Sequence, residues 1–353
     1  MNFKKVVLCF IAIISTSLLF IAGAVIYVDP FFHYHKPQPD LYYTLKSQRY
    51  QNDGILKNFD YDAIITGTSM TENFKATEFD KLFGVNSIKV SYSGGSFKEI
   101  NDAIRTGCES PNNVRYVIRS LDLYKIIADK DEMRKDLGTY PTYLYNNNLI
   151  DDVKYIFNKD AFFKHTLRVL KNKVKGKRGG ITSFDAYSNW NKHYKFGRTY
   201  VMKGQKGYVA NIKQKSFSAK DLQMATENIR ANVTELAKAN PKTKFYYFFP
   251  PYSVAYWANQ SSRGELERTL AAEKLAIEMI LDCPNIKLFS FNLMTDIVTD
   301  LNNYKDTTHY GEWINSDMLR YMKNDVGLIT KDNYKDYLKQ ERELYVNYPY
   351  ESI

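Results

Sequence analysis

The segment "YDAIITGTS" (61–69) is a run of apolar and β-branched residues that ends in a glycine, a threonine and a serine. A short, nearly continuous apolar run is typical of a strand that is buried on both faces of a parallel sheet. Ser69 stands where this pattern gives way to that of a helix. A serine at such a position can serve as a helix cap or as a nucleophile, and the segment alone does not distinguish the two.

Similar runs recur along the chain, and most are separated by segments with helical periodicity. Further strands are expected at 86–95, 114–123, 243–252 and 285–292. Helices are expected at 70–83, 96–107, 218–240, 264–282 and 311–325. Alternation of strands and helices predicts an α/β fold with a doubly wound, five-stranded parallel sheet.

A long segment separates the third and fourth expected strands. It is far longer than a crossover connection requires, so 124–217 is predicted to be an inserted lid domain. The insertion contains "DAYSNWNKHYKFGRTY" (185–200), which is rich in aromatic and amide side chains. These could contact sugars, with Trp190 as a candidate, or could simply pack within the lid.

The N-terminus predicts a membrane anchor. Lys4 and Lys5 precede an uncharged run from Val6 to Val28, which can cross a hydrocarbon core of about 30 Å. The position of the lysines places the N-terminus in the cytoplasm and the rest of the chain outside. An uncleaved anchor is expected, and a signal peptide cleaved near Ala24 is the alternative.

The expected organisation is therefore a cytoplasmic tip and transmembrane anchor (1–28), a juxtamembrane linker (29–60) and an outer domain (61–353) that carries the insertion. Cys108 and Cys283 lie in the outer domain, where they could pair or remain two thiols. Their spacing matches no metal-binding pattern, and neither a metal nor a cofactor is expected.

The 353 residues carry a net charge of +10. Outside the cell this charge favours membrane headgroups or an anionic envelope polymer as partners, and nucleic acid is not expected. The densest basic stretch is 164–180, which can be a solvated connector or a site for a polyanion.

Open α/β sheets place their sites at the carboxyl ends of the strands. Ser69 ends the first expected strand, and "NNYKDTTHYGEW" (302–313), which follows the last, contains Asp306 and His309 in a D-x-x-H spacing. A nucleophilic serine needs a base to accept its proton, and the base needs an acid to fix its tautomer. These three residues can fill those roles. Backbone N–H groups of Ser69 and of Gly94 or Gly95 could form the oxyanion hole.

The order of "GTSMTEN" (67–73), "SYSGGS" (91–96) and "DTTHY" (306–310) resembles the SGNH/GDSL hydrolase superfamily. The resemblance is to its membrane-anchored extracytoplasmic members, such as the D-alanine-transfer protein of teichoic acid modification and polysaccharide O-acetylation proteins. It covers the five strands and both ends of the outer domain, but not the insertion. It implies a flavodoxin-like sheet and a serine that forms an acyl-enzyme.

By this resemblance Ser69 is the nucleophile, His309 the base and Asp306 its orienting acid, and Gly94 or Gly95 is the glycine donor. The first block has Gly-Thr-Ser in place of Gly-Asp-Ser.

The third block of the family offers an asparagine to the oxyanion, whereas "RSLDLY" (119–124) has Asp122 near that position. An ionised aspartate cannot donate a hydrogen bond. Either Asp122 pairs with Arg119, or another donor such as Asn73 completes the hole. Asp122, Arg119 and Tyr252 join Trp190 as candidate substrate contacts.

The expected function is that of an extracytoplasmic serine esterase or O-acyltransferase. Its substrates would be acyl esters, with acetyl preferred, of a cell-envelope glycan or a teichoic-acid-like polymer. Transfer would need a membrane-bound protein that delivers the acyl group. One alternative is a non-catalytic, membrane-anchored protein that binds a polymer or a partner. A cofactor or phosphate binder using "SGGS" (93–96) is disfavoured, because the chain lacks a glycine-rich strand–helix fingerprint.

Overall fold

The computed structural model describes residues 3–136, 139–146, 148–205, 207–210 and 212–353. The chain forms two compact units. Unit 1 comprises Met1–Phe59 and Leu137–Ser183, and unit 2 comprises Asp60–Asp136 and Phe184–Ile353. The predicted insertion 124–217 is therefore shared, since its middle part belongs to unit 1 and both its ends belong to unit 2.

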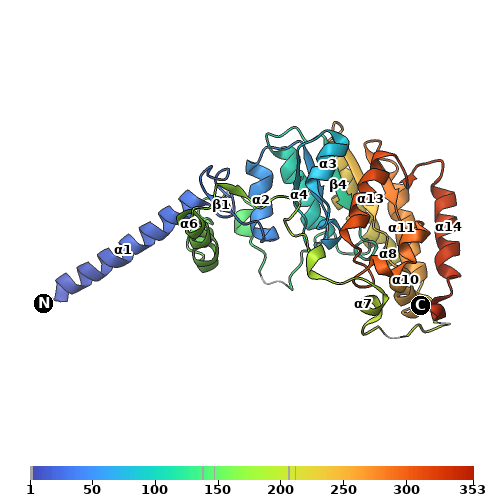
Figure 1. The fold of residues 1–353 in the computed structure, drawn as a ribbon. Coiled ribbons are helices and arrows are strands. Elements are labelled where there is room, and N and C mark those ends of the chain that lie inside the picture. Colours follow the sequence, from blue (N-terminus) through green and yellow to red (C-terminus); the bar gives the residue numbers. More distant parts are fainter. Residues whose placement is uncertain (1–2, 137–138, 147, 206, 211) are drawn as a thin grey trace. The chain divides into compact units, whose positions relative to one another are not determined.

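Unit 2 is a mixed α/β unit whose sheet, which includes β4, is flanked by helices (Figure 1). Within the described residues, the strands of this sheet stand in the order β3-β2-β4-β6-β7-β8. The strands are β2 (Ala63–Thr66), β3 (Ser87–Lys89), β4 (Tyr116–Ser120), β6 (Lys244–Phe249), β7 (Ile286–Ser290) and β8 (Leu328–Ile329). Neighbours from β3 to β7 pair in parallel, and each lies within an apolar run that predicted a strand. β8 pairs antiparallel with β7 and was not predicted. The sheet is thus not purely parallel, and two residues are too few to show a strand periodicity.

Helices follow the strands of unit 2. They are η1 (Ser69–Thr71), α3 (Ala76–Phe83), α4 (Phe97–Glu109), η2 (Leu123–Lys125), η5 (Asn191–His193), α7 (Arg198–Met202), α8 (Ala219–Ile229), η6 (Arg230–Thr234), α9 (Glu235–Ala239), α10 (Val254–Ser262), α11 (Leu266–Ile280), α12 (Thr295–Val298), η7 (Leu301–Asn303), α13 (Glu312–Lys323), α14 (Tyr334–Val346) and η8 (Tyr350–Ser352). The predicted helix 218–240 is present as α8, η6 and α9, and it begins with a capping box formed by Ser218 and Asp221. The sequence reading missed α10 and α14.

Burial of the strands explains their composition. Every residue of β2 is buried, and β6 exposes only its first residue. Strands covered on both faces need apolar or aromatic side chains at successive positions, which is the pattern of these segments. Cys108 and Cys283 are free thiols in the described chain.

Unit 1 contains α1 (Phe3–Val28), which among the described residues is the helix long and apolar enough to cross a membrane. The other elements are β1 (Tyr42–Tyr43), α2 (Gln48–Asn58), η3 (Thr142–Leu144), α5 (Val153–Ile156), η4 (Asp160–Thr166), α6 (Leu167–Val174) and β5 (Gly180–Ile181). The expected linker 29–60 is folded, because β1 pairs in parallel with β5 and α2 buries a run of its residues. The packing partners of this segment lie more than a hundred residues away in the sequence, so local pattern could not reveal them.

Candidate active site

Ser69, His309 and Asp306 form a continuous chain of hydrogen bonds. Ser69 Oγ lies 2.8 Å from His309 Nε2. On the other side of the imidazole, Nδ1 lies 2.8 Å from Asp306 Oδ2 and 3.0 Å from Oδ1. These contacts are within the range required of a nucleophile, its base and the acid that orients the base. The structure therefore brings together the three side chains that the sequence pointed to.

The turn after β2 leaves the hydroxyl of Ser69 available. Gly67 has φ of +142°, a backbone conformation that residues with a Cβ rarely adopt. Thr68 then caps η1, since its Oγ1 accepts a hydrogen bond from the N–H of Met70. Because Thr68 is the cap, Ser69 is not, and its side chain is partly exposed and contacts His309 instead.

The turn at 304–310 aims the histidine and the aspartate. Tyr304 and Tyr310 form an antiparallel bridge at its base. Within it, Asp306 Oδ1 accepts the N–H groups of Thr308 and His309, each at 2.9 Å. The same carboxylate also faces the His309 ring. A separation of three residues lets the Asp306 side chain reach both the N–H and the ring of His309, which explains the D-x-x-H spacing.

The charge of Asp306 follows from these contacts. Its partial burial would raise the pKa, but the hydrogen bonds from His309 and from the N–H of Thr308 outweigh that effect and hold the pKa of Asp306 well below its usual value. An ionised Asp306 requires a proton on His309 Nδ1, which leaves Nε2 as the acceptor for the proton of Ser69.

The loop after β3 lies against the Ser69 turn. The N–H of Tyr92 donates to Gly67 O at 2.8 Å, and Ser91 Oγ is 2.8 Å from Thr71 Oγ1. The N–H of Gly95 is used within the loop, where it donates to Tyr92 O at 2.7 Å. In the described part of the chain the N–H groups of Gly94 and Ser69 make no such bond. Of the two glycines that the sequence offered, Gly94 therefore has the available donor.

Asn73 supplies a third open donor. It is only 1% exposed, and its Oδ1 accepts the N–H of Trp190 at 3.2 Å. Its Nδ2 is buried and has no hydrogen-bond partner among the described residues. Buried polar atoms are normally paired, so an unpaired amide one helical turn after Ser69 calls for an explanation.

Lys89 holds the turn that carries Asn73. This lysine is fully buried at the end of β3, and its Nζ donates to the carbonyl oxygens of Glu72 and Phe74, which flank Asn73. Burial lowers the pKa of Lys89 to about 7. Sequence analysis missed this residue, although a lysine inside a buried strand is a signal of a special role.

Asp122 is fully buried and stabilises the turn that carries Ser69. Its Oδ2 accepts from Thr68 Oγ1 at 2.9 Å and from Ser120 Oγ at 3.2 Å, and its Oδ1 accepts from the hydroxyl of Tyr252 at 2.6 Å. Burial raises the pKa of Asp122, and the three hydroxyl donors lower it in part. Asp122 therefore positions Thr68, the residue that caps η1.

Pairing of Arg119 with Asp122, one of the two alternatives that the sequence left open, is not found within the described structure. The guanidinium of Arg119 instead donates to the carbonyl oxygen of Asn232 at 2.6 Å and stacks on the rings of Phe97 and Tyr247. Arg119, Asp122 and Tyr252 are all inaccessible, so these three candidate substrate contacts lie in the interior. A position near a strand end does not tell which way the side chain points.

Trp190 does lie beside the triad. Its ring meets the His309 ring edge-on, with centroids 5.6 Å apart. The Nζ of Lys305 lies 4.3 Å from the centroid of the Trp190 ring and 3.7 Å from that of Tyr194. Burial lowers the pKa of Lys305. Sequence analysis did not select Lys305, whose signal was its place directly before the D-x-x-H motif.

Comparisons with known proteins give little guidance. No protein-family model matches the chain, and no curated protein matches it. A solved structure from Streptococcus pneumonia, described as that of a candidate platelet activating factor, is similar with a TM-score of 0.34 and 9% identity, over 82% of this chain and 91% of that chain. A likeness of this size supports no inference, so the functional argument depends on the geometry of the site.

Proposed function

We propose that this chain is an extracytoplasmic serine esterase or O-acyltransferase of the SGNH/GDSL type. Its substrates would be acyl esters, most simply acetyl esters, of a cell-envelope glycan or teichoic-acid-like polymer. The observation that carries the proposal is the hydrogen-bonded chain from Ser69 through His309 to Asp306. The order of the parallel strands, β3-β2-β4-β6-β7, supports a flavodoxin-like arrangement of the sheet.

The reaction would proceed in two steps. His309 Nε2 accepts the proton of Ser69 as its Oγ attacks the ester carbonyl, and the oxyanion receives hydrogen bonds from the N–H groups of Ser69 and Gly94 and from Asn73 Nδ2. The alcohol leaves with the proton from His309, and Ser69 keeps the acyl group. Water or a sugar hydroxyl then gives its proton to His309 and takes the acyl group, and His309 returns the proton to Ser69 Oγ as the bond between Ser69 and the acyl group breaks. Asp306 stays ionised throughout.

The surroundings of the triad support a glycan or anionic polymer as the substrate. Trp190 offers an aromatic surface next to His309, Tyr194 packs edge-on against Trp190, and the ammonium group of Lys305 lies over both of these rings. Sugars can stack on aromatic rings, and a cation favours a phosphate or carboxylate group nearby.

The length and hydropathy of α1 support the anchoring part of the proposal. The basic residues before it favour a cytoplasmic N-terminus, which would place both folded units outside the cell membrane. If the reaction is transfer, a membrane-bound protein would deliver the acyl group.

The test is labelling with a fluorophosphonate, which reacts with activated serines. The full chain in lipid nanodiscs is labelled and analysed by intact mass, together with Ser69→Ala, His309→Ala and the matched control Ser316→Ala. Ser316 lies on α13 and bonds only to its own helix among the contacts described. We expect one adduct on Ser69 in the parent and in the control, and none in the other two variants. No adduct under conditions that label a known esterase would overturn the proposal and favour a binding protein.

A further inference from the structure

One helical segment of unit 1 exposes two adjoining rows of side chains. The apolar row, spaced by four, three and four residues along η4 and α6, consists of Phe163, Leu167, Leu170 and Val174. Such spacing places side chains on one face of a helix. Phe163 is 64% exposed, Leu167 38% and Val174 87%, and Leu170 is partly buried. The basic row comes one residue later in each case and consists of Lys164, Arg168, Lys171 and Lys175.

The apolar row is not the face that packs within unit 1. Phe162, Thr166 and Val169 are buried on a different face of the same helical segment. Phe162 belongs to an apolar cluster that also contains Val25 of α1. The helix thus has a complete buried face and, in addition, an exposed apolar face. A continuous row of exposed apolar side chains on a helix that already has a buried face points to a surface that binds a membrane or a partner.

A second group of exposed apolar side chains lies close by in the chain. Leu149 and Ile150 are 79% and 81% exposed, and Val153 and Phe157 at the ends of α5 are also exposed. Both α5 and η4 pack against α1. Exposed apolar side chains therefore lie on, or next in sequence to, two elements that pack against the helix that is apolar enough to cross a membrane.

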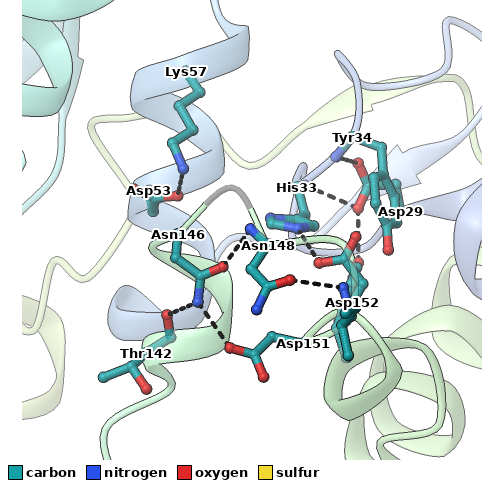
Figure 2. A network of polar contacts seen from close by, with 12 residues as sticks. Asp29, His33, Tyr34, Asp53, Lys57, Thr142, Asn146, Asn148, Asp151 and Asp152 are labelled. Atoms are coloured by element: carbon teal, nitrogen blue, oxygen red, sulfur yellow. Dashed lines mark hydrogen bonds and ion pairs between the residues drawn. The ribbon is translucent and has the colours of Figure 1, made fainter.

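The end of α1 is held firmly to unit 1. Val25 and Val28 in its last turn are buried. Asp29 follows directly, and its carboxylate accepts the N–H groups of His33, Tyr34 and His35 as well as the hydroxyl of Tyr155 (Figure 2 shows the region).

A second contact in this region joins His33 Nε2 to Asp152 at 3.1 Å. These bonds fix the residues that follow α1 to the rest of unit 1, so no flexible spacer separates the two. A membrane that α1 crosses must therefore begin close to the exposed rows on η4 and α6.

The charge of this helical segment indicates that its exposed face contacts a membrane. The basic row borders the apolar row along its length, which is the arrangement of helices that lie in the interface of a bilayer. Basic side chains at this depth are attracted to anionic lipid headgroups. The first part of the basic stretch 164–180 is helical up to Val174, so its basic side chains project at regular intervals from a helix.

We propose that η4 and α6 dock unit 1 onto the outer leaflet of the membrane that α1 crosses. The apolar row enters the boundary between headgroups and acyl chains, and the basic row binds anionic headgroups. This inference rests on the proposed anchoring by α1, and it is independent of the chemistry at Ser69. Unit 1 then rests on the membrane surface and does not act as a flexible tether.

The test measures the depth of single labels in the full chain. Cysteines are introduced as Phe163→Cys and Val174→Cys after Cys9, Cys108 and Cys283 have been replaced by alanine. A fluorophore is attached, and the protein is placed in nanodiscs of phosphatidylcholine with a minority of phosphatidylglycerol. Lipids with a nitroxide on the acyl chain quench fluorophores that enter the bilayer. Ile14→Cys within α1 is the positive control, and Leu222→Cys, 46% exposed on unit 2, is the negative control.

We expect several-fold stronger quenching at positions 163 and 174 than at 222. If the fluorophore at position 14 is quenched but those at 163 and 174 are quenched no more than the one at 222, the docking is overturned and the anchor remains. No quenching at 14 overturns the anchor and the docking together. Protection of 163 and 174 from a water-soluble quencher in native membranes but not in nanodiscs would assign the face to a protein partner and overturn the lipid assignment.

The basic row has its own test in the same assay. Changing Lys164, Arg168, Lys171 and Lys175 to glutamine should weaken quenching at 174 in nanodiscs with phosphatidylglycerol, and should leave it unchanged in phosphatidylcholine alone. Equal quenching of the two proteins in both lipids would overturn the role of the basic row.

Discussion

Replacing Asn73 by aspartate changes one atom that the structure leaves without a partner. Aspartate keeps the Oδ1 that accepts the N–H of Trp190, and it places an oxygen where the donor Nδ2 stands. The turn that carries Asn73 is held by Lys89 through backbone carbonyl groups, which the substitution does not alter. The variant therefore removes the proposed oxyanion donor and retains the packing contact.

The expected loss can be worked out from the role of the donor. One oxyanion donor contributes about 3–4 kcal/mol to the transition state, and each 1.36 kcal/mol is tenfold in rate. Asn73→Asp should therefore lower kcat by about 10²–10³-fold, and its negative charge close to the oxyanion should add to the loss. Asn73→Ala removes the donor without adding a charge. It also loses a neutral hydrogen bond, which contributes only about 0.5–1.5 kcal/mol to stability.

The assay is kcat for p-nitrophenyl acetate hydrolysis by the full chain, with Tm measured on each variant. Asn347→Asp makes the same chemical change after α14 and serves as the control. We expect low kcat for both Asn73 variants and parent values for the control. Asn73→Ala should keep a near-parent Tm, whereas Asn73→Asp should lower Tm because it places a carboxylate at a buried position. Parent turnover in Asn73→Ala at near-parent Tm would refute the assignment of Asn73 to the oxyanion hole.

Two further predictions concern carboxyl groups. Asp306→Asn should lower kcat by about 10⁴-fold at unchanged Tm, because an amide can hold the wrong tautomer of His309, and parent kcat would contradict the triad. In α11 and α14, the Tyr337 hydroxyl lies 2.9 Å from Glu273 Oε1 and 2.7 Å from Glu341 Oε1, and its single proton cannot serve both. Burial raises the pKa of Glu341, so the folded state binds its proton more tightly than the unfolded chain does, and stability should fall as pH rises from the ordinary range of a glutamic acid toward neutrality. Urea unfolding of Glu341→Gln should show a flatter pH dependence, and a curve parallel to that of the parent would contradict this.

Much of the sheet could be read from local pattern. Five apolar runs predicted β2, β3, β4, β6 and β7, because a strand covered on both faces must be apolar at nearly every position. Closeness of Ser69 to the D-x-x-H turn could also be expected, since the carboxyl ends of parallel strands meet at one edge. The Asp306–His309 spacing is local, and the turn that explains it spans only a few residues.

Contacts between distant segments were beyond the reach of local pattern. Whether Thr68 or Ser69 caps η1 depends on Asp122, which binds Thr68 from more than fifty residues away. The contact of Arg119 with Asn232 and the pairing of β1 with β5 in unit 1 likewise join segments that are far apart in the sequence. Local periodicity reports which residues are buried and in what element, because it reflects the geometry of one helix or strand. It carries no information on which buried polar groups meet, since that is settled only when the segments pack and each buried donor and acceptor must find a partner.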